Sequence, residues 1–170
     1  MPAQKASTAD RWTDPSCPVA RTLDLVGDRW SLLIVRDAMD GASAFTDFHH
    51  RLGIARNILT DRLRRLTEHG ILARDVAPSG KRQTYALTEA GRDLFTAVLA
   101  LRQWGERHAF APGEKRSVLV DQQGQVVPDL RAVDAAGTSL TCSTTRVEKV
   151  PETAPQPQAT ADDPRPSEIT

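Results

Sequence analysis

The spacing of apolar residues changes near residue 70, and this change constrains the fold more than any other feature of the chain. Between residues 29 and 68, apolar side chains recur every three to four positions, which predicts helices. From 71 to 87, short apolar stretches flank Pro78-Ser79-Gly80, a pattern typical of a β-hairpin. The sequence therefore predicts a mostly α fold with one small β element, an α+β architecture.

Four helical patterns precede the hairpin. The first carries Val19, Leu23 and Val26 on one face, and Gly27 ends it. The second, over 29–39, is apolar on most sides, so we expect it at the centre of the domain. The third and fourth cover 46–52, with Thr46 as the N-cap, and 55–68, with one stripe of Leu59, Leu63 and Leu66.

A last helix is expected from the N-cap Thr88 to about His108. Its apolar residues cover more than one face: Leu94, Phe95, Val98, Leu99, Leu101 and Trp104. A helix with two apolar faces needs two surfaces to bury them, so we expect it to contact its own domain and a partner.

The chain divides by composition into four parts. Residues 1–15 are polar and predict a flexible arm, and 16–110 hold the helices and the hairpin. Residues 111–150 favour short strands, at 116–122 and 139–150, because β-branched residues are frequent there. Residues 151–170 contain five prolines and few apolar side chains, so we expect a disordered tail.

The net charge of the chain is zero, but its charge is distributed unevenly. From Arg51 to Arg82 there are eight Lys and Arg against three Asp and Glu, a local balance of 8 − 3 = +5. Local clusters of this kind favour binding to a polyanion, although a solvated helix face has the same composition.

The two cysteines, Cys17 and Cys142, form neither a disulfide framework nor a zinc pattern, so we expect no metal and no cofactor. The first fifteen residues lack the apolar core of a signal peptide. No apolar run approaches the roughly 20 residues that span a bilayer. We therefore expect a cytoplasmic protein with no membrane partner.

The order helix, short helix, glycine turn, basic helix and hairpin is that of a winged helix-turn-helix. The helix over about 55–68 would be the recognition helix in the major groove, and the hairpin over 71–87 would be the wing. Arg and Asn can pair with guanine and adenine, and basic residues at a wing tip can meet phosphate. The predicted DNA contacts are Arg56, Asn57, Thr60, Arg64, Arg65, Lys81 and Arg82. Arg62 is expected to be structural.

The ordered part of the chain, from about Ser16 to His108, resembles the HxlR-type transcriptional regulators. The resemblance lies in Cys17-Pro18-Val19, Gly27-Asp28-Arg29-Trp30, Phe45-x-x-Phe48, Ile54-Ala55-Arg56-Asn57-Ile58-Leu59-Thr60-Asp61-Arg62-Leu63 and Tyr85-Ala86-Leu87-Thr88-Glu89-Ala90-Gly91. It implies a bacterial winged-helix regulator that binds double-stranded operator DNA as a homodimer, as repressor or activator. It also implies dimerisation mainly through the N-terminal and last helices.

The chain departs from the family pattern at three places. Ala55 stands where many members have a capping serine, and the wing tip is Ser79-Gly80-Lys81-Arg82 in place of a proline-containing turn. Residues 117–150 resemble the extension of longer members, which often carry several cysteines there, whereas this chain has only Cys142.

Cys17 and two tryptophans are candidates for receiving a signal. Proline prefers the first turn of a helix, which would put Cys17 at the N-cap, where the helix dipole favours a thiolate. Some family members sense oxidants or electrophiles through a cysteine at this position, so Cys17 is either a sensor or a packing residue. Trp30 and Trp104 would form either an effector pocket for a small ligand or a dimer interface.

Two other functions stay open from the residues alone. The domain could be a winged-helix module that binds protein without sequence-specific DNA binding. It could also be a small thiol-dependent enzyme using Cys17, although no histidine or acid lies at a spacing that would activate the thiol.

Overall fold

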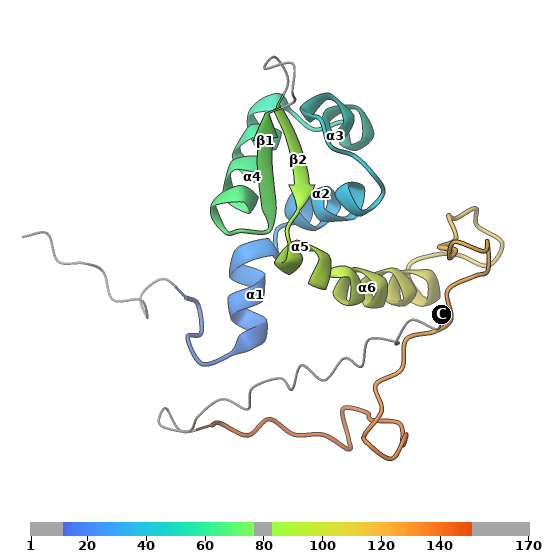
Figure 1. Cartoon of the computed structure of the whole chain (residues 1–170). Helices are drawn as coiled ribbons and strands as arrows, with labels where there is room; N and C mark the ends of the chain where they lie inside the picture. Colours follow the sequence, from blue (N-terminus) through green and yellow to red (C-terminus); the bar gives the residue numbers. More distant parts are fainter. Residues whose placement is uncertain (1–11, 77–82, 151–170) are drawn as a thin grey trace, which may run out of the picture. The chain divides into compact units, whose positions relative to one another are not determined.

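The computed structural model describes residues 12–76 and 83–150, and the chain divides into two units, 1–131 and 132–170. Every helix and strand of the described residues belongs to the first unit (Figure 1). They are α1 (Pro18–Val26), α2 (Arg29–Met39), α3 (Phe45–Leu52), α4 (Arg56–Glu68), β1 (Leu72–Val76), β2 (Gln83–Leu87), α5 (Glu89–Asp93) and α6 (Phe95–His108). The mostly α fold with a small β-hairpin is confirmed, and its order is that of a winged helix-turn-helix.

The hairpin is antiparallel, with Leu72 opposite Leu87 and Val76 opposite Gln83. The segment before α3 adds a single bridge to β2, where the Tyr85 N–H donates to the Ser43 carbonyl at 2.8 Å. The predicted tip residues Lys81 and Arg82 lie in 77–82, outside the described residues.

The core forms where α2, α3 and α4 meet. Ile34 and Val35 of α2 are fully buried, which confirms the central position predicted for this helix. The predicted leucine stripe of α4 (Leu59, Leu63, Leu66) is also fully buried, and it packs in one cluster with Phe48 of α3. Burying such side chains stabilises a domain by about 1.5–3 kcal/mol each, so this cluster fixes the orientation of α4.

The N-terminus of α3 differs from the prediction. The helix begins at Phe45, so Thr46 lies inside it and does not cap it. The carboxylate of Asp47 instead accepts the Ser43 and Ala44 N–H groups at 3.2 and 2.9 Å. A carboxylate in the first turn that reaches back in this way replaces the missing cap.

The helix expected from Thr88 to His108 is interrupted at Leu94, which separates α5 from α6. Thr88 caps α5 as predicted, and its hydroxyl accepts the Gly91 N–H at 3.1 Å. Gly91 lets α5 lie directly against the residue that precedes β1, because a Cβ there would be 2.2 Å from the Ile71 carbonyl oxygen. The chain turns after this close contact, and Leu94 packs on the core.

Residues 111–150 form turns with isolated bridges, so the short strands expected at 116–122 and 139–150 are not formed. In the first unit Val120 bridges Val126, and in the second Val133 bridges Ser139. Each pair closes a tight turn around an aspartate and a glycine, Asp121 to Gly124 and Asp134 to Gly137. Most apolar side chains of this region are exposed, so no packed face favours longer strands.

Part of the arm expected at residues 1–15 packs against α1. Thr13 donates its N–H and hydroxyl to Asp24 at 2.9 and 2.7 Å, and the Arg21 guanidinium lies 5.2 Å from the Trp12 ring centroid. In the described part of the chain, no helix is long and apolar enough to cross a membrane.

Candidate nucleic-acid interface

Arg62 fixes α4 to the start of α2. Its Nε donates to the Asp28 carboxylate at 2.9 Å, and Asp28 is also the N-cap of α2, accepting the Trp30 and Ser31 N–H groups. Burial alone would raise the pKa of Asp28, but hydrogen bonds from Ser31 and the charge of Arg62 outweigh it and lower that pKa. Asp28 therefore stays ionised, and Arg62 has the structural role that the sequence indicated.

The first turns of α4 present three of the predicted contacts to solvent. Arg56, Asn57 and Thr60 are all exposed. The Arg56 guanidinium lies 5.8 Å from the Phe45 ring centroid, and the Thr60 hydroxyl donates to the Arg56 carbonyl at 2.8 Å. Ala55 supplies no side-chain cap, so the N–H groups at this helix end keep no side-chain acceptor.

Arg64 is exposed too, but its guanidinium is already paired. Nη2 donates to Asp61 at 2.7 Å, and Nη1 donates to both carboxylate oxygens of Glu68 at 2.8 Å. The hydrogen bond to Asp61 raises the pKa of Arg64, and the same bond lowers the pKa of Asp61. Arg64 must therefore leave two carboxylates before it can pair with a base.

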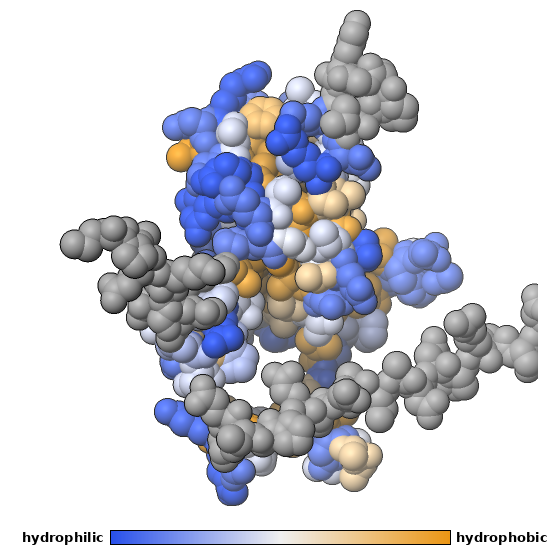
Figure 2. Space-filling view, turned by 60° about the vertical axis from the view of Figure 1, so that its left-hand side comes forward, coloured by the Kyte–Doolittle hydropathy of each residue, from blue (hydrophilic) through white to orange (hydrophobic). Residues whose placement is uncertain are grey.

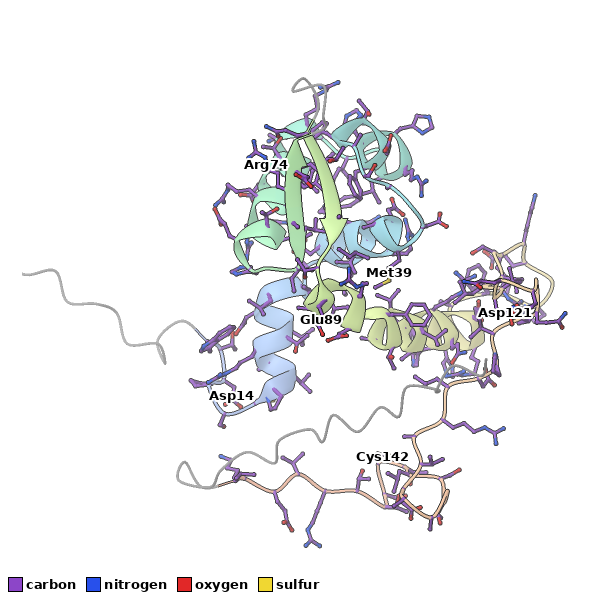
Figure 3. The ribbon with its side chains drawn as sticks, viewed as in Figure 1. Asp14, Met39, Arg74, Glu89, Asp121 and Cys142 are labelled. Atoms are coloured by element: carbon purple, nitrogen blue, oxygen red, sulfur yellow. The ribbon has the colours of Figure 1, made fainter. Side chains whose placement is uncertain are left out.

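The remaining basic residues surround this face. Arg65 is a half-buried residue of α4, and Arg74 is exposed on β1, where Figure 3 labels it. Both carry cations of the kind that contact phosphate.

Apolar residues are exposed on α1 and α6. Val19 and Leu23 of α1 are 67% and 56% exposed, and Leu101 and Trp104 of α6 are 55% and 58% exposed. In the upper part of the view in Figure 2 many surface residues are hydrophilic, and hydrophobic residues reach the surface between and below them. This exposure fits the prediction that the last helix has two apolar faces.

The two predicted tryptophans differ in their surroundings. Trp30 packs against the core, with the Arg29 guanidinium 4.7 Å from its ring centroid. Trp104 is exposed, and its ring centroid lies 5.1 Å from that of His108. A large cavity next to α6 is lined by neither of them.

Cys17 is the N-cap of α1, as the position of Pro18 predicts. Its half-buried Sγ accepts the Ala20 N–H at 3.5 Å, and both Cys17 and Cys142 are free thiols. Within residues 12–76 and 83–150, no three His, Cys, Asp or Glu side chains gather as metal ligands.

The structure decides one feature of α4 that the sequence left open, an ion pair of Arg64 as the alternative to a DNA contact, and it adds one that the sequence did not indicate. Asp61 and Glu68 neutralise Arg64, and their spacing of three and four positions from it was a readable signal for ion pairs. Ile58, 37% exposed, is an apolar residue beside the polar face, and it could contact a thymine methyl group.

The profile of the HxlR-like helix-turn-helix proteins matches residues 25–111, half of the chain. The chain belongs to this family. This match confirms the resemblance seen in its motifs.

Solved and curated relatives agree with this assignment. The crystal structure of PA1607, described as a candidate transcription factor, is 50% identical and superimposes with a TM-score of 0.76, covering 79% of this chain and 95% of that one. The HTH-type transcriptional regulator Rv3095 of Mycobacterium tuberculosis is 46% identical over 95 residues, which are 55% of this chain and 60% of that protein. The reduced redox regulator HypR is 35% identical, with a TM-score of 0.51 over 55% of this chain and 94% of its own.

Proposed function

We propose that this HxlR-like protein binds operator DNA, with α4 in the major groove and the β1–β2 hairpin beside it. The observation that carries the proposal is the free first half of α4, where Arg56, Asn57 and Thr60 are exposed on a helix that Arg62 holds in place. A helix fits the major groove, and Arg and Asn are the side chains that pair with base edges there.

We propose further that the binding unit is a homodimer formed through α1 and α6. The exposed Val19, Leu23, Leu101 and Trp104 support this, because a partner would remove them from water. In a symmetric dimer the same surface of each subunit forms the interface, and the two recognition helices can enter successive major grooves.

Fluorescence anisotropy with DNA from upstream of the gene tests the DNA-binding proposal. Arg56→Ala and Asn57→Ala should each weaken specific binding by about 1–3 kcal/mol, the value of a good bidentate base contact. Arg146→Ala is the matched control, since it removes the same charge in the second unit, which contains none of α1, α4 and α6, and its partner there is Glu148. It should leave affinity near that of the wild type.

The alternative is a winged-helix module that binds protein. A complex that is insensitive to salt, or Arg56→Ala and Asn57→Ala variants that bind like wild type, would favour it, because phosphate contacts make DNA binding salt-dependent. The thiol-enzyme alternative gains no support from the curated relatives, which are named HTH-type transcriptional regulators.

A narrower proposal concerns the signal. We infer that oxidation of Cys17 changes DNA binding, because its sulfur caps α1, one of the two helices with exposed apolar residues. The likeness to HypR, which is a redox regulator, supports this proposal.

A further inference from the structure

Asp61 lies at the centre of the exposed side of α4, the helix that runs beside β1 (Figure 1). It follows Leu59 by two positions and precedes Leu63 by two, so at about 100° per residue its side chain points away from both buried leucines. Asn57 lies one turn before it on the same face. The side chain of Asp61 is 43% exposed, so a ligand on this face can reach it.

Two arginines hold the Asp61 carboxylate in place. Arg62 Nη1 donates to Oδ2 at 2.6 Å, and Arg64 Nη2 donates to Oδ1 at 2.7 Å. Arg62 is itself bound to Asp28, the N-cap of α2, at 2.9 Å. The hydrogen bond from Arg64 lowers the pKa of Asp61, so the carboxylate stays ionised at neutral pH. Asp61 is therefore a charged acceptor that is already positioned relative to the core.

The carboxylate keeps room for another donor. An ionised carboxylate has about four lone-pair sites, and each oxygen of Asp61 accepts one hydrogen bond from the described residues. A further N–H can therefore donate to Asp61 while both arginines stay bound. Arg64 differs, because its guanidinium has to leave Asp61 and Glu68 before it can contact a base.

A carboxylate on this face opposes binding to phosphate. Its negative charge repels the DNA backbone whatever the sequence, and Arg62 and Arg64 offset only part of that repulsion. Asp61 is therefore favourable in a DNA complex only where a base supplies a donor. A residue of this kind contributes to the choice between sequences more than to affinity.

The donors available in the major groove are few. Cytosine presents its N4 amino group, whereas guanine and thymine present acceptors. Adenine presents an amino group beside the N7 acceptor, and N7 would repel a carboxylate. Of the four bases, cytosine thus suits an acceptor without a donor of its own.

We propose that Asp61 accepts a hydrogen bond from the N4 amino group of a cytosine and thereby determines one base of the operator. This inference rests on the proposed placement of α4 in the major groove. Asp61 is the sixth residue of α4, near the N-terminal part of a recognition helix that contacts base edges. Glu68, the other carboxylate bound to Arg64, lies about 10 Å further along the helix and has no such position.

Selection from a library of duplexes with a random centre, using the full chain, gives the half-site that the protein prefers. Each cytosine of that half-site is then replaced in turn by N4-methylcytosine, which keeps the pair with guanine and removes the N4 hydrogen in the major groove. Fluorescence anisotropy measures the Kd of wild type, Asp61→Ala and Glu68→Ala for each duplex.

At one cytosine of each half-site, the methyl group should weaken binding of wild type at least tenfold, because a hydrogen bond to a charged group is lost. The same change should alter the Kd of Asp61→Ala less than about twofold. Glu68→Ala is the matched control, since it also removes one carboxylate from Arg64, and it should respond as wild type does.

Three results would overturn the inference. The first is wild type that tolerates N4-methylcytosine at every position, which needs no variant and so does not depend on variant folding. The second is Asp61→Ala that responds as wild type does. The third is an equal loss of response in Glu68→Ala, which would assign the preference to Arg64. Failure of the proposed function is distinct, because wild type would then enrich no sequence in the selection.

Discussion

Cys17 can stabilise α1 as its N-cap, and as a free thiol it can also react with an oxidant. Its sulfur accepts a backbone N–H of α1, and the thiol is free and half-buried. Oxidation would replace this acceptor and add bulk at the start of a helix whose Val19 and Leu23 are exposed. The effect of oxidant on DNA binding therefore separates a sensor from a packing residue.

The test is a DNA-binding titration with and without diamide, a two-electron oxidant that joins the Cys17 thiols of two subunits in a disulfide and is itself reduced to a hydrazide. Wild type should change its operator affinity at least tenfold, and Cys17→Ser should be unresponsive. Cys142→Ser is the control, because it removes the other thiol, which is exposed. If Cys17→Ser responds to diamide as wild type does, Cys17 is a packing residue.

For single residues, the sequence predicts which side chains of α4 are exposed better than it predicts their ion-pair partners. Leucines repeat every three to four positions along α4. This spacing predicts that Arg56, Asn57 and Thr60 are exposed and that they share one face of the helix. The pairing of Arg64 with Asp61 and Glu68 depends on rotamers chosen within the fold, so the sequence indicates it only as one option.

Among the helices, α1 and α6 both carry apolar side chains that the rest of the chain leaves exposed to solvent. The buried residue of α1 is Val26, while Val19 and Leu23 lie toward its other end in solvent. Fully burying such a side chain stabilises an assembly by about 1.5–3 kcal/mol, so a dimer through both helices is favourable.

Val19→Asp should weaken the dimer, because its interface would bury a carboxylate without a partner. We expect the dimer Kd to rise at least tenfold, about 1.4 kcal/mol, in sedimentation equilibrium. Val147→Asp makes the same change at a valine that is 96% exposed in the second unit, and it should leave the Kd unaltered. Equal dimerisation of the two variants would remove α1 from the interface.

The order and types of the elements were predictable, and their ends were less so. The spacing of apolar residues predicted α2, α4 and the hairpin, because each of them buries a regular row of apolar side chains. The start of α3 was misplaced because Asp47 caps from inside the helix, and the break at Leu94 depends on the close contact between Gly91 and Ile71. Residues 111–150 were misjudged because β-branched composition without a buried face does not make a strand.

For the whole molecule, we propose a two-fold dimer in which each subunit supplies one recognition helix, α4. Such a dimer contacts two half-sites whose centres lie about 10–10.5 bp apart, or a multiple of this spacing. Neither a monomer nor a protein-binding module gives this spacing. The spacing of the two half-sites therefore tests both the orientation of α4 and the formation of the dimer.

Hydroxyl-radical footprinting on the upstream DNA, with the stoichiometry of the same complex from sedimentation, is the most direct measurement. A two-fold dimer that reads DNA through α4 should protect two half-sites of inverted sequence, separated by whole helical turns, with two chains for each duplex. One protected half-site occupied by one chain, or protection that does not depend on sequence, would contradict it.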